Sequence, residues 1–415
     1  MITKLSDADR DSIFVHASAR GGSTYIFNVL RRMESLLCFD EPISDDFTYF
    51  DKNDYARRVA RGQWNWSHSF LRRFSRAEFV DAWDDVMHLY PQGVTFRDYA
   101  PRDGIISDDL KVYLAALIQY ANLEGKRAAL CDIYSRGRAG VLRDAFGGFH
   151  VAQYRDPISQ FGSCFRGLQE YGAWLFLIIP LWELGPSAKN RFYSIIPEAW
   201  RVPALAWPAD NRAQRWATTE EYLAMILSPE RQALESLIRW HLLSWFLNNL
   251  AAIIYSDLTI DMDRLFDDLE YRESVGKTLA SEIGAQPDFS DLTKFTRYYA
   301  FEHVDIDRIC NEIVARVSDA HENGTLEVAI AALSKGKPIV PASVAIKLLR
   351  AKFEDAMARM ASNSGVTIIT SEEWKSLAQK HRHFWANPRL RCAMRYAYPY
   401  ALPLVEAARK IGILR

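Results

Sequence analysis

The chain has 415 residues and a formal net charge of −1, with 49% hydrophobic and 25% charged residues. This length allows one large α/β domain with an appendage, or two domains. The near-zero charge excludes a global field that would attract nucleic acid, so we expect no nucleic-acid partner. The five cysteines are scattered without CxxC spacing, which disfavours a disulfide framework or a zinc site. The polar first residues, and the lack of an apolar run of about 18 residues, predict a cytoplasmic protein without a transmembrane helix.

The first structured segment reads as a strand, a glycine-rich loop and a helix. Residues 13–17 are apolar and β-prone, residues 18–24 are mostly small, and apolar residues then recur at helical spacing. The start of a helix has unpaired backbone N–H groups and the positive end of the dipole, so the loop suits a phosphate or sulfonate. Its candidate ligands are Arg20, Gly21, Gly22, Ser23 and Thr24.

This loop lacks one element of a nucleotide-triphosphatase loop. Gly22 stands before Ser23, where such a loop carries the lysine that reaches the β- and γ-phosphates. The loop therefore favours an anion other than Mg²⁺–ATP. An ordinary strand–helix turn remains the alternative interpretation.

Further strands and helices alternate along the chain. Residues 36–39 predict a second strand, which ends in Asp40, Glu41 and Pro42. Further strands are expected at 127–133, 150–154 and 258–260, and helices at 81–90, 108–123, 135–146 (with Ser135 as a possible cap), 231–256 and 273–283, the last closed by Gly284. This alternation predicts a three-layer α/β fold with a parallel sheet between helices over residues 1–300.

The region beyond residue 300 reads as a mainly helical extension, residues 301–415. Helices are expected at 305–319, 325–334, 342–361 and 371–383. The end of the chain, 380–415, is basic and interleaved with aromatic residues. It suggests a docked helix pair with a solvated basic rim, or a patch that contacts an anionic membrane surface or substrate.

A second candidate anion site follows the strand at 150–154. Arg155 lies at its carboxyl end, and Ser163 follows eight residues later. The two side chains can converge on one phosphate if the chain turns back at Pro157, and the planar guanidinium binds phosphate oxygens in pairs. Alternatively, Arg155 pairs with Asp156 or a surface acid, and Ser163 only packs.

The loop at 20–24 followed by the 155–163 site resembles the PAPS-dependent sulfotransferases, where PAPS is 3′-phosphoadenosine 5′-phosphosulfate. The resemblance covers residues 12–290, including the acidic turn at 259–265, and implies a P-loop-like α/β fold without a required metal. It implies that the first loop binds the 5′-phosphosulfate, with donors from Gly21, Gly22, Ser23, Thr24 and Tyr25. It also implies that Arg155 and Ser163 bind the 3′-phosphate. Arg20 would stabilise the leaving group while a sulfuryl group passes to a hydroxyl.

The resemblance also suggests a general base. In cytosolic small-molecule members the base is a histidine before the arginine-bearing strand, but residues 130–134 contain none. In carbohydrate-type members it is the glutamate of a Glu-Pro pair after the second strand, which Glu41 matches. His16, His68 and His150 are alternatives, and Asp132 and Arg136 lie near the predicted cleft without an assigned role.

The acceptor is expected in the tryptophan-rich segment 158–235, which contains Trp174, Trp182, Trp200, Trp207 and Trp216. Aromatic rings stack on sugars or acyl chains, which favours a carbohydrate or lipid-linked sugar, although such residues also serve core packing.

Two other functions remain open. One is a P-loop small-molecule kinase, and the other is a non-catalytic nucleotide-binding scaffold. The sequence at 275–278, which ends like a P-loop motif, is rejected because Tyr271 replaces the required glycine and the segment lies in a predicted helix.

Overall fold

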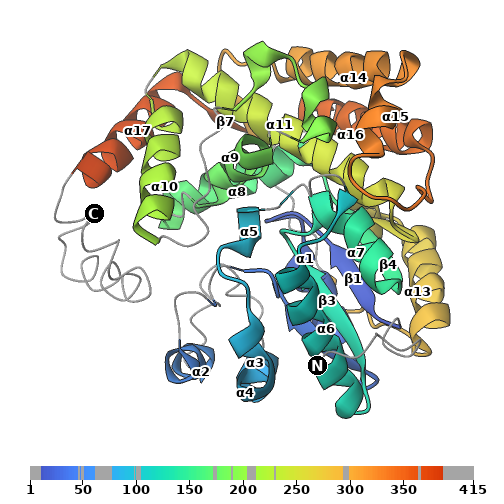
Figure 1. Cartoon of the computed structure of the whole chain (residues 1–415). Coiled ribbons are helices and arrows are strands. Elements are labelled where there is room, and N and C mark those ends of the chain that lie inside the picture. Colours follow the sequence, from blue (N-terminus) through green and yellow to red (C-terminus); the bar gives the residue numbers. More distant parts are fainter. Residues whose placement is uncertain are drawn as a thin grey trace.

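The structure, a computed structural model, describes residues 11–44, 47, 51–60, 77–97, 99, 104–171, 175–187, 190–202, 212–228, 230–292, 299–362 and 366–386. It contains a five-stranded parallel sheet with the order β2-β3-β1-β4-β5. Figure 1 shows its strands β1, β3 and β4 among the surrounding helices. The strands are β1 (Ile13–His16), β2 (Leu36–Asp40), β3 (Arg127–Asp132), β4 (Phe149–Tyr154) and β5 (Leu258–Asp261). The predicted α/β class with a parallel sheet flanked by helices is confirmed.

Helices cover both faces of this sheet because its strands carry apolar residues on both faces. On one face, Ile13 and Val15 of β1 join a core with α1 (Ser23–Arg31) and α13 (Leu269–Ile283). On the other face, Phe14 packs with α6 (Asp108–Leu123) and α7 (Ala139–Phe146). Residues 128–131 of β3 alternate between these two cores in the same way. The result is the helix–sheet–helix arrangement that the alternating pattern predicts.

The remaining elements near the sheet are short helices and the capped turn after β5. They are α2 (Lys52–Ala60), α3 (Ala77–Asp81), α4 (Trp83–Val86), α5 (Val94–Arg97) and α12 (Met262–Asp267). The helix predicted over 81–90 is thus wrong in its bounds, because it is divided between α3, α4 and a 3₁₀ turn at Met87–Leu89. The predicted closure of α13 by Gly284 is confirmed, since this residue is left-handed with a φ of 79°.

The helix predicted from Ser135 begins later than expected. A 3₁₀ turn at Arg136–Arg138 precedes α7, and the Ser135 side chain makes no capping hydrogen bond. Its hydroxyl instead lies 2.8 Å from Nδ1 of His16, on β1. A tertiary partner has therefore replaced the local cap.

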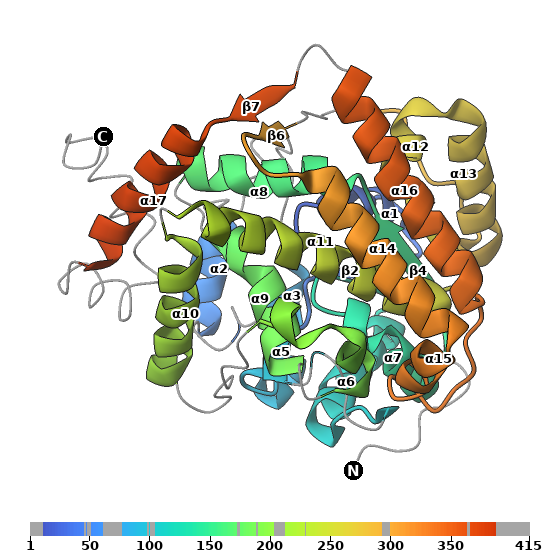
Figure 2. The same ribbon diagram turned by 90° about the horizontal axis from the view of Figure 1, so that it is seen from above.

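A second helical layer surrounds α11 (Arg231–Ile254). It comprises α8 (Pro157–Tyr171), α9 (Leu175–Ser187), α10 (Arg212–Ile226), α14 (Ile306–Glu322), α15 (Thr325–Ile330), α16 (Ala342–Ser362) and α17 (Ser371–Ala386), with 3₁₀ turns at Arg191–Ile195 and Glu198–Trp200. Figure 2 shows α14 and α16 lying along α11, and residues of all three share one hydrophobic core. The helices predicted beyond residue 300 are present, and in the described part of the chain they fold against α11.

One small parallel pair in this region escaped prediction: β6 (Tyr299–Phe301) pairs with β7 (Thr367–Ile369). Each has three residues, too few for periodicity to indicate a strand. Helix α11 is long and apolar enough to cross a membrane, but 89% of its most apolar window is buried inside the protein. We therefore interpret it as a core helix.

Candidate functional site

The order of the strands creates a crevice between β1 and β4. From β1 the chain crosses to β2 on one side of the sheet, and from β4 it continues to β5 on the other side. Loops that leave neighbouring parallel strands in opposite directions open a crevice beyond their carboxyl ends, where α/β proteins bind ligands. The residues that follow β1 and β4 are the two predicted anion sites.

The loop after β1 turns into α1 through two residues with positive φ. Gly22 is left-handed with a φ of 95° and directly precedes α1, so the first N–H groups of this nine-residue helix open toward the loop. Arg20 is also left-handed, with a φ of 61°. A Cβ on Gly22 would lie 3.1 Å from both Nε2 of Gln153 and Cε of Met262, so glycine is needed here for conformation and for space.

The loop contacts the second predicted anion site directly. Nε of Arg20 donates a hydrogen bond of 3.0 Å to the hydroxyl of Ser163, on α8. The guanidinium of Arg20 also lies over the ring of Phe176, 5.3 Å from its centroid. Arg155 approaches the loop from β4, where its Nη1 lies 3.4 Å from the carbonyl oxygen of Arg20. The two predicted anion sites, which lie more than 130 residues apart in the sequence, are therefore in direct contact.

Arg155 is half-buried, and within the described residues its guanidinium makes no ion pair. Its Nε is buried without a hydrogen-bond partner there. Asp156, the neighbour that could have paired with it, instead accepts hydrogen bonds from the N–H groups of Ile158 (2.9 Å) and Ser159 (2.8 Å). The cation of Arg155 is thus available to a ligand.

Two glutamines that the sequence analysis missed hold the loop in place. Nε2 of Gln153, on β4, donates to the carbonyl of Gly21 at 2.9 Å. Nε2 of Gln160, on α8, donates to the hydroxyl of Ser18 (2.8 Å) and to the carbonyl of Ala19 (2.7 Å). The loop is therefore anchored to the elements that carry Arg155 and Ser163.

The other predicted loop ligands lie at the start of α1. Ser23, Thr24 and Tyr25 form its first turn, and all three are half-buried. The hydroxyl of Tyr25 reaches Asp291 at 3.4 Å, and its ring packs on Phe289. Ser23 and Thr24 therefore remain better placed than the Tyr25 side chain to contact an anion at the helix start.

Glu41 follows β2 at the same edge of the sheet. Its N–H donates to the carbonyl of Cys131 at 2.7 Å, and its φ is 50°. In the described part of the chain only Arg20, Glu41 and His303 are non-glycine residues with positive φ. Because β3 lies between β2 and β1, the backbone of Glu41 is two strand spacings, roughly 10 Å, from the end of β1. Two of these three strained positions are the residues predicted as catalytic.

Two of the three alternative histidines, which lie on the neighbouring strands β1 and β4, form a buried pair. Nε2 of His16 lies 2.9 Å from Nδ1 of His150, whose Nε2 lies 2.8 Å from the carbonyl of Gly147. The carbonyl can only accept, so His150 donates through Nε2. With both imidazoles neutral, His16 then donates through Nε2 to Nδ1 of His150, and its Nδ1 accepts from the Ser135 hydroxyl, whose other acceptor is the carbonyl of Asp132 at 3.2 Å. Burial lowers the pKa of His150 to about 4 and that of His16 well below its ordinary value. Both imidazoles are therefore neutral structural members, while His68 lies outside the described residues.

The two residues without an assigned role are also internal. Asp132 accepts hydrogen bonds from the N–H groups of Ile43 (2.9 Å) and Tyr134 (2.5 Å), and burial raises its pKa to about 6. Glu41 is close enough to contribute to this rise. Arg136 forms a buried ion pair with Glu183, with Nη2 at 3.0 and 3.2 Å from the two carboxylate oxygens.

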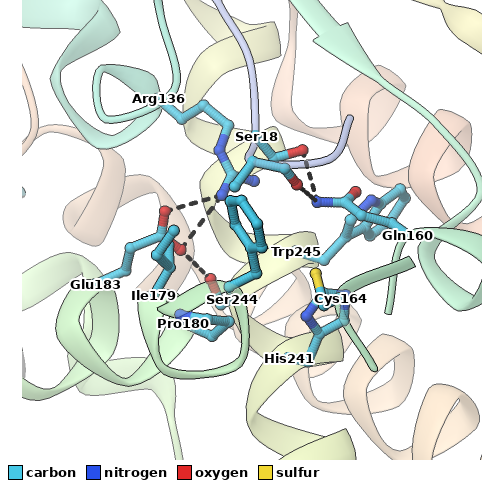
Figure 3. A pocket seen from close by; sticks show the side chains of 12 residues that line it. Ser18, Arg136, Gln160, Cys164, Ile179, Pro180, Glu183, His241, Ser244 and Trp245 are labelled. Atoms are coloured by element: carbon cyan, nitrogen blue, oxygen red, sulfur yellow. Dashed lines mark hydrogen bonds and ion pairs between the residues drawn. The ribbon is translucent and has the colours of Figure 1, made fainter. Parts of the chain in front are cut away.

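A small cavity lies on the other side of the loop, between α8, α9 and α11 (Figure 3). Its volume is about 20 Å³, which provides room for roughly one water molecule. Its lining combines apolar residues, among them Phe176, Ile179 and Trp245, with polar ones that include Ser18 and Gln160. The cavity thus shares the anion loop as part of its lining.

His241 of α11 lines this cavity and was missed because a single histidine in an apolar helix carries no local signal. The residue is 4% exposed, and neither ring nitrogen has a hydrogen-bond partner among the described residues. Burial, and secondarily the charge of Arg136, lower its pKa to about 3, weakly opposed by the carbonyl of Pro157. A neutral imidazole therefore faces a polar space, where a water molecule or a ligand hydroxyl can satisfy it.

Comparisons with protein-family models, curated proteins and solved structures found no match. The assignment of this site therefore rests on its geometry and chemistry. Within the described residues, no group of three or more metal-ligating side chains comes together.

Several predicted features lie outside the described residues. They include the basic segment from residue 387 onward and Trp207, and the side chain of Trp216 is not described either. Of the tryptophans in the 158–235 segment, Trp182 is buried against Phe96, with ring centroids 4.9 Å apart. Trp200 packs under the guanidinium of Arg239 at 4.9 Å. These two serve packing between helices.

Proposed function

We propose that this chain is a PAPS-dependent sulfotransferase of the carbohydrate type, on a P-loop-like α/β fold. One observation carries the proposal: the half-buried guanidinium of Arg155 lies beside the anion loop with no carboxylate paired to it in the described part of the chain. A partly desolvated cation is unfavourable unless an anion compensates it. A phosphate group matches the planar fork of arginine.

The donor would bind along the crevice between β1 and β4. Its 5′-phosphosulfate would lie against the loop and the first N–H groups of α1, with Arg20 beside it. Its 3′-phosphate would lie against Arg155 and Ser163. The Arg20–Ser163 hydrogen bond supports one continuous site, because it brings side chains from the two halves to 3.0 Å of each other.

In the transfer step, an acceptor hydroxyl oxygen forms a bond to sulfur while the bond from sulfur to the bridging oxygen breaks. The electron pair stays on the 5′-phosphate of the departing 3′,5′-adenosine bisphosphate, and the hydroxyl proton passes to a base. Arg20 and the N–H groups at the start of α1 oppose the charge that grows on the leaving group. No metal is needed in this scheme.

Glu41 is the proposed base. Its left-handed backbone costs about 1 kcal/mol, and such strain is concentrated at functional positions. The structure adds His241 as a second group that could take the proton, because it lines the cavity beside the loop. Its low pKa makes it the weaker base.

The acceptor is proposed to be a carbohydrate or a lipid-linked sugar, modified in the cytoplasm. The segment 158–235 contributes α8 and α9 to the cavity beside the loop, including the ring of Phe176. Peripheral membrane contact through residues 380–415 remains a prediction.

The test is a calorimetric titration of the purified protein with 3′,5′-adenosine bisphosphate, the product of the donor, and separately with Mg²⁺–ATP. We expect micromolar binding of the bisphosphate, about −8 kcal/mol, and none of Mg²⁺–ATP. The Arg155→Ala variant should lose this binding, whereas Arg264→Ala, which removes an exposed arginine paired with Asp268, should keep it. Binding of Mg²⁺–ATP alone would support the kinase, and unchanged binding by Arg155→Ala would contradict the assigned site.

A further inference from the structure

Helix α16, in the region beyond residue 300, contacts the elements that hold Arg155. Lys352 of α16 is almost fully buried, with a side chain 3% exposed. Its ammonium group lies 2.8 and 3.0 Å from the two carboxylate oxygens of Asp261, at the end of β5. It also lies 2.7 Å from a carboxylate oxygen of Asp263, in α12. One lysine thus bridges two buried acids.

These acids lead directly to the second anion site. The same oxygen of Asp263 accepts a hydrogen bond of 2.5 Å from the N–H of Asp156. Asp156 in turn caps the start of α8, the helix that carries Ser163. The position of the backbone after β4 therefore depends on Asp263, which Lys352 holds.

The next residue of α16 supports the same backbone through a second path. The ring of Phe353 stacks on Trp245, with centroids 5.2 Å apart and an interplanar angle of 26°. The indole N–H of Trp245 donates to the carbonyl of Arg155 at 3.1 Å. Two consecutive side chains of α16 thus support the backbone of Arg155 and Asp156, Phe353 through Trp245 and Lys352 through Asp263.

The charges explain why a lysine is needed here. Asp156, Asp261 and Asp263 are all buried. Against the effect of burial, the charges of Lys352 and then Arg155 lower the pKa of Asp263. Arg155 is the other cation whose charge acts on Asp263, so without Lys352 it would be left to compensate this carboxylate. A guanidinium that pairs with this carboxylate is no longer available to bind a phosphate.

We infer that Lys352 is a positioning residue for the anion site: by neutralising Asp261 and Asp263 it keeps the guanidinium of Arg155 available to the ligand. The C-terminal region is then part of the donor site. This inference rests on the proposed function for the identity of the ligand, but not for the binding of an anion at Arg155.

The test measures calorimetric dissociation constants for two probes, 3′,5′-adenosine bisphosphate and inorganic pyrophosphate. We expect Lys352→Met to weaken the binding of both probes at least tenfold. Lys352→Arg, which keeps the charge, should retain more affinity than Lys352→Met. Lys347→Met, which removes an exposed lysine from the same helix, should bind as the wild type does.

A double variant separates positioning from a merely structural role. In Lys352→Met with Asp263→Asn, the amide oxygen can still accept from Asp156, but the carboxylate that would capture Arg155 is gone. We expect affinity to return to within about threefold of the wild type, even where the melting temperature stays lowered. Affinity that follows melting temperature through all variants, without recovery in the double variant, would overturn the inference.

The two probes also separate this inference from the proposed function. If the wild type binds pyrophosphate but not the bisphosphate, the donor assignment fails, and the Lys352 series is decided with pyrophosphate. If the wild type binds neither probe, both proposals are overturned.

Discussion

The guanidinium of Arg20 donates a hydrogen bond of 3.0 Å to the hydroxyl of Ser163, a residue 143 positions further along the chain. The contact joins the loop after β1 to the helix after β4, across the crevice where the sheet connections diverge. It orients the Arg20 side chain through a neutral hydroxyl, which brings no charge of its own to the site. An anion that enters the crevice would thus meet a cation already oriented by a neutral partner.

Replacing Ser163 by alanine should weaken bisphosphate binding about five- to tenfold, because about 1 kcal/mol of hydrogen bonding is lost. Calorimetry measures the effect. Ser194→Ala is the control, since this exposed hydroxyl donates only to the carbonyl of Arg191. Equal affinity in the two variants would show that Ser163 does not contact the ligand.

Replacing Gly22 by alanine should lower both stability and anion binding. The left-handed backbone alone costs about 1 kcal/mol, and the contacts of the new Cβ with Gln153 and Met262 add about 1–3 kcal/mol. Gly125→Ala is a matched control, because Gly125 has a φ of 67° with no atom within 4 Å of an added Cβ. Urea unfolding should show the larger loss for Gly22→Ala, and bisphosphate binding should fall only in that variant. Equal losses in both variants would mean that the loop tolerates the extra carbon.

Two substitutions of Glu41 should separate strain from chemistry. Glu41→Gln keeps the strained backbone, so it should abolish turnover while donor binding and stability stay unchanged. Glu41→Gly should abolish turnover equally but raise stability by about 0.5–1 kcal/mol, because glycine adopts a φ of 50° without a steric penalty. Transfer assays, calorimetry and urea unfolding provide the three measurements. Retained turnover in both variants would contradict Glu41 as the base. His241 would then be the remaining candidate, and the turnover of His241→Asn would test it.

The buried His150 should make stability fall in mild acid. Its pKa is about 4 in the folded protein and about 6.5 in the unfolded chain, so the unfolded chain binds the proton more strongly between these values. Its contribution to stability is complete above pH 6.5 and is lost as the pH falls toward 4. Between pH 7 and pH 5 the loss is about 2 kcal/mol.

Urea unfolding at pH 7 and pH 5 tests this expectation. The decrease in the wild type should exceed that of His150→Gln by about this amount. His16 and His241 shift in the same direction and remain in both proteins. An identical decrease in the two proteins would place the acid sensitivity elsewhere.

Much of the fold was predictable because its strands are short apolar runs followed by distinct polar signals. The bounds of α6 match the prediction, and the strands differ by at most one residue at either end. The meeting of Arg20 with the Arg155 site was predictable in outline, since the carboxyl ends of parallel strands share one edge.

The supporting residues were not predictable from local sequence. Ser135 was expected to cap a helix, but its hydroxyl is hydrogen-bonded to His16, which is 119 residues away in the chain. Gln153 and Gln160 anchor the loop through hydrogen bonds that span 132 and 142 residues of the chain. Lys352 pairs with Asp261, from which it is separated by 91 residues. Such partners depend on how distant segments pack, and no spacing rule encodes that.

The bridge from Lys352 to Asp261 also has a consequence for synthesis of the chain. When Asp261 is added to the growing chain, Lys352 is still 91 residues away, and translation of that stretch takes roughly 5–20 s. During that interval, Asp261 and Asp263 lack their cation, and the backbone after β4 lacks its support. The sheet can assemble early, but we expect the crevice to become competent only once α16 has emerged, so that nascent chains cut short before residue 352 should be inactive.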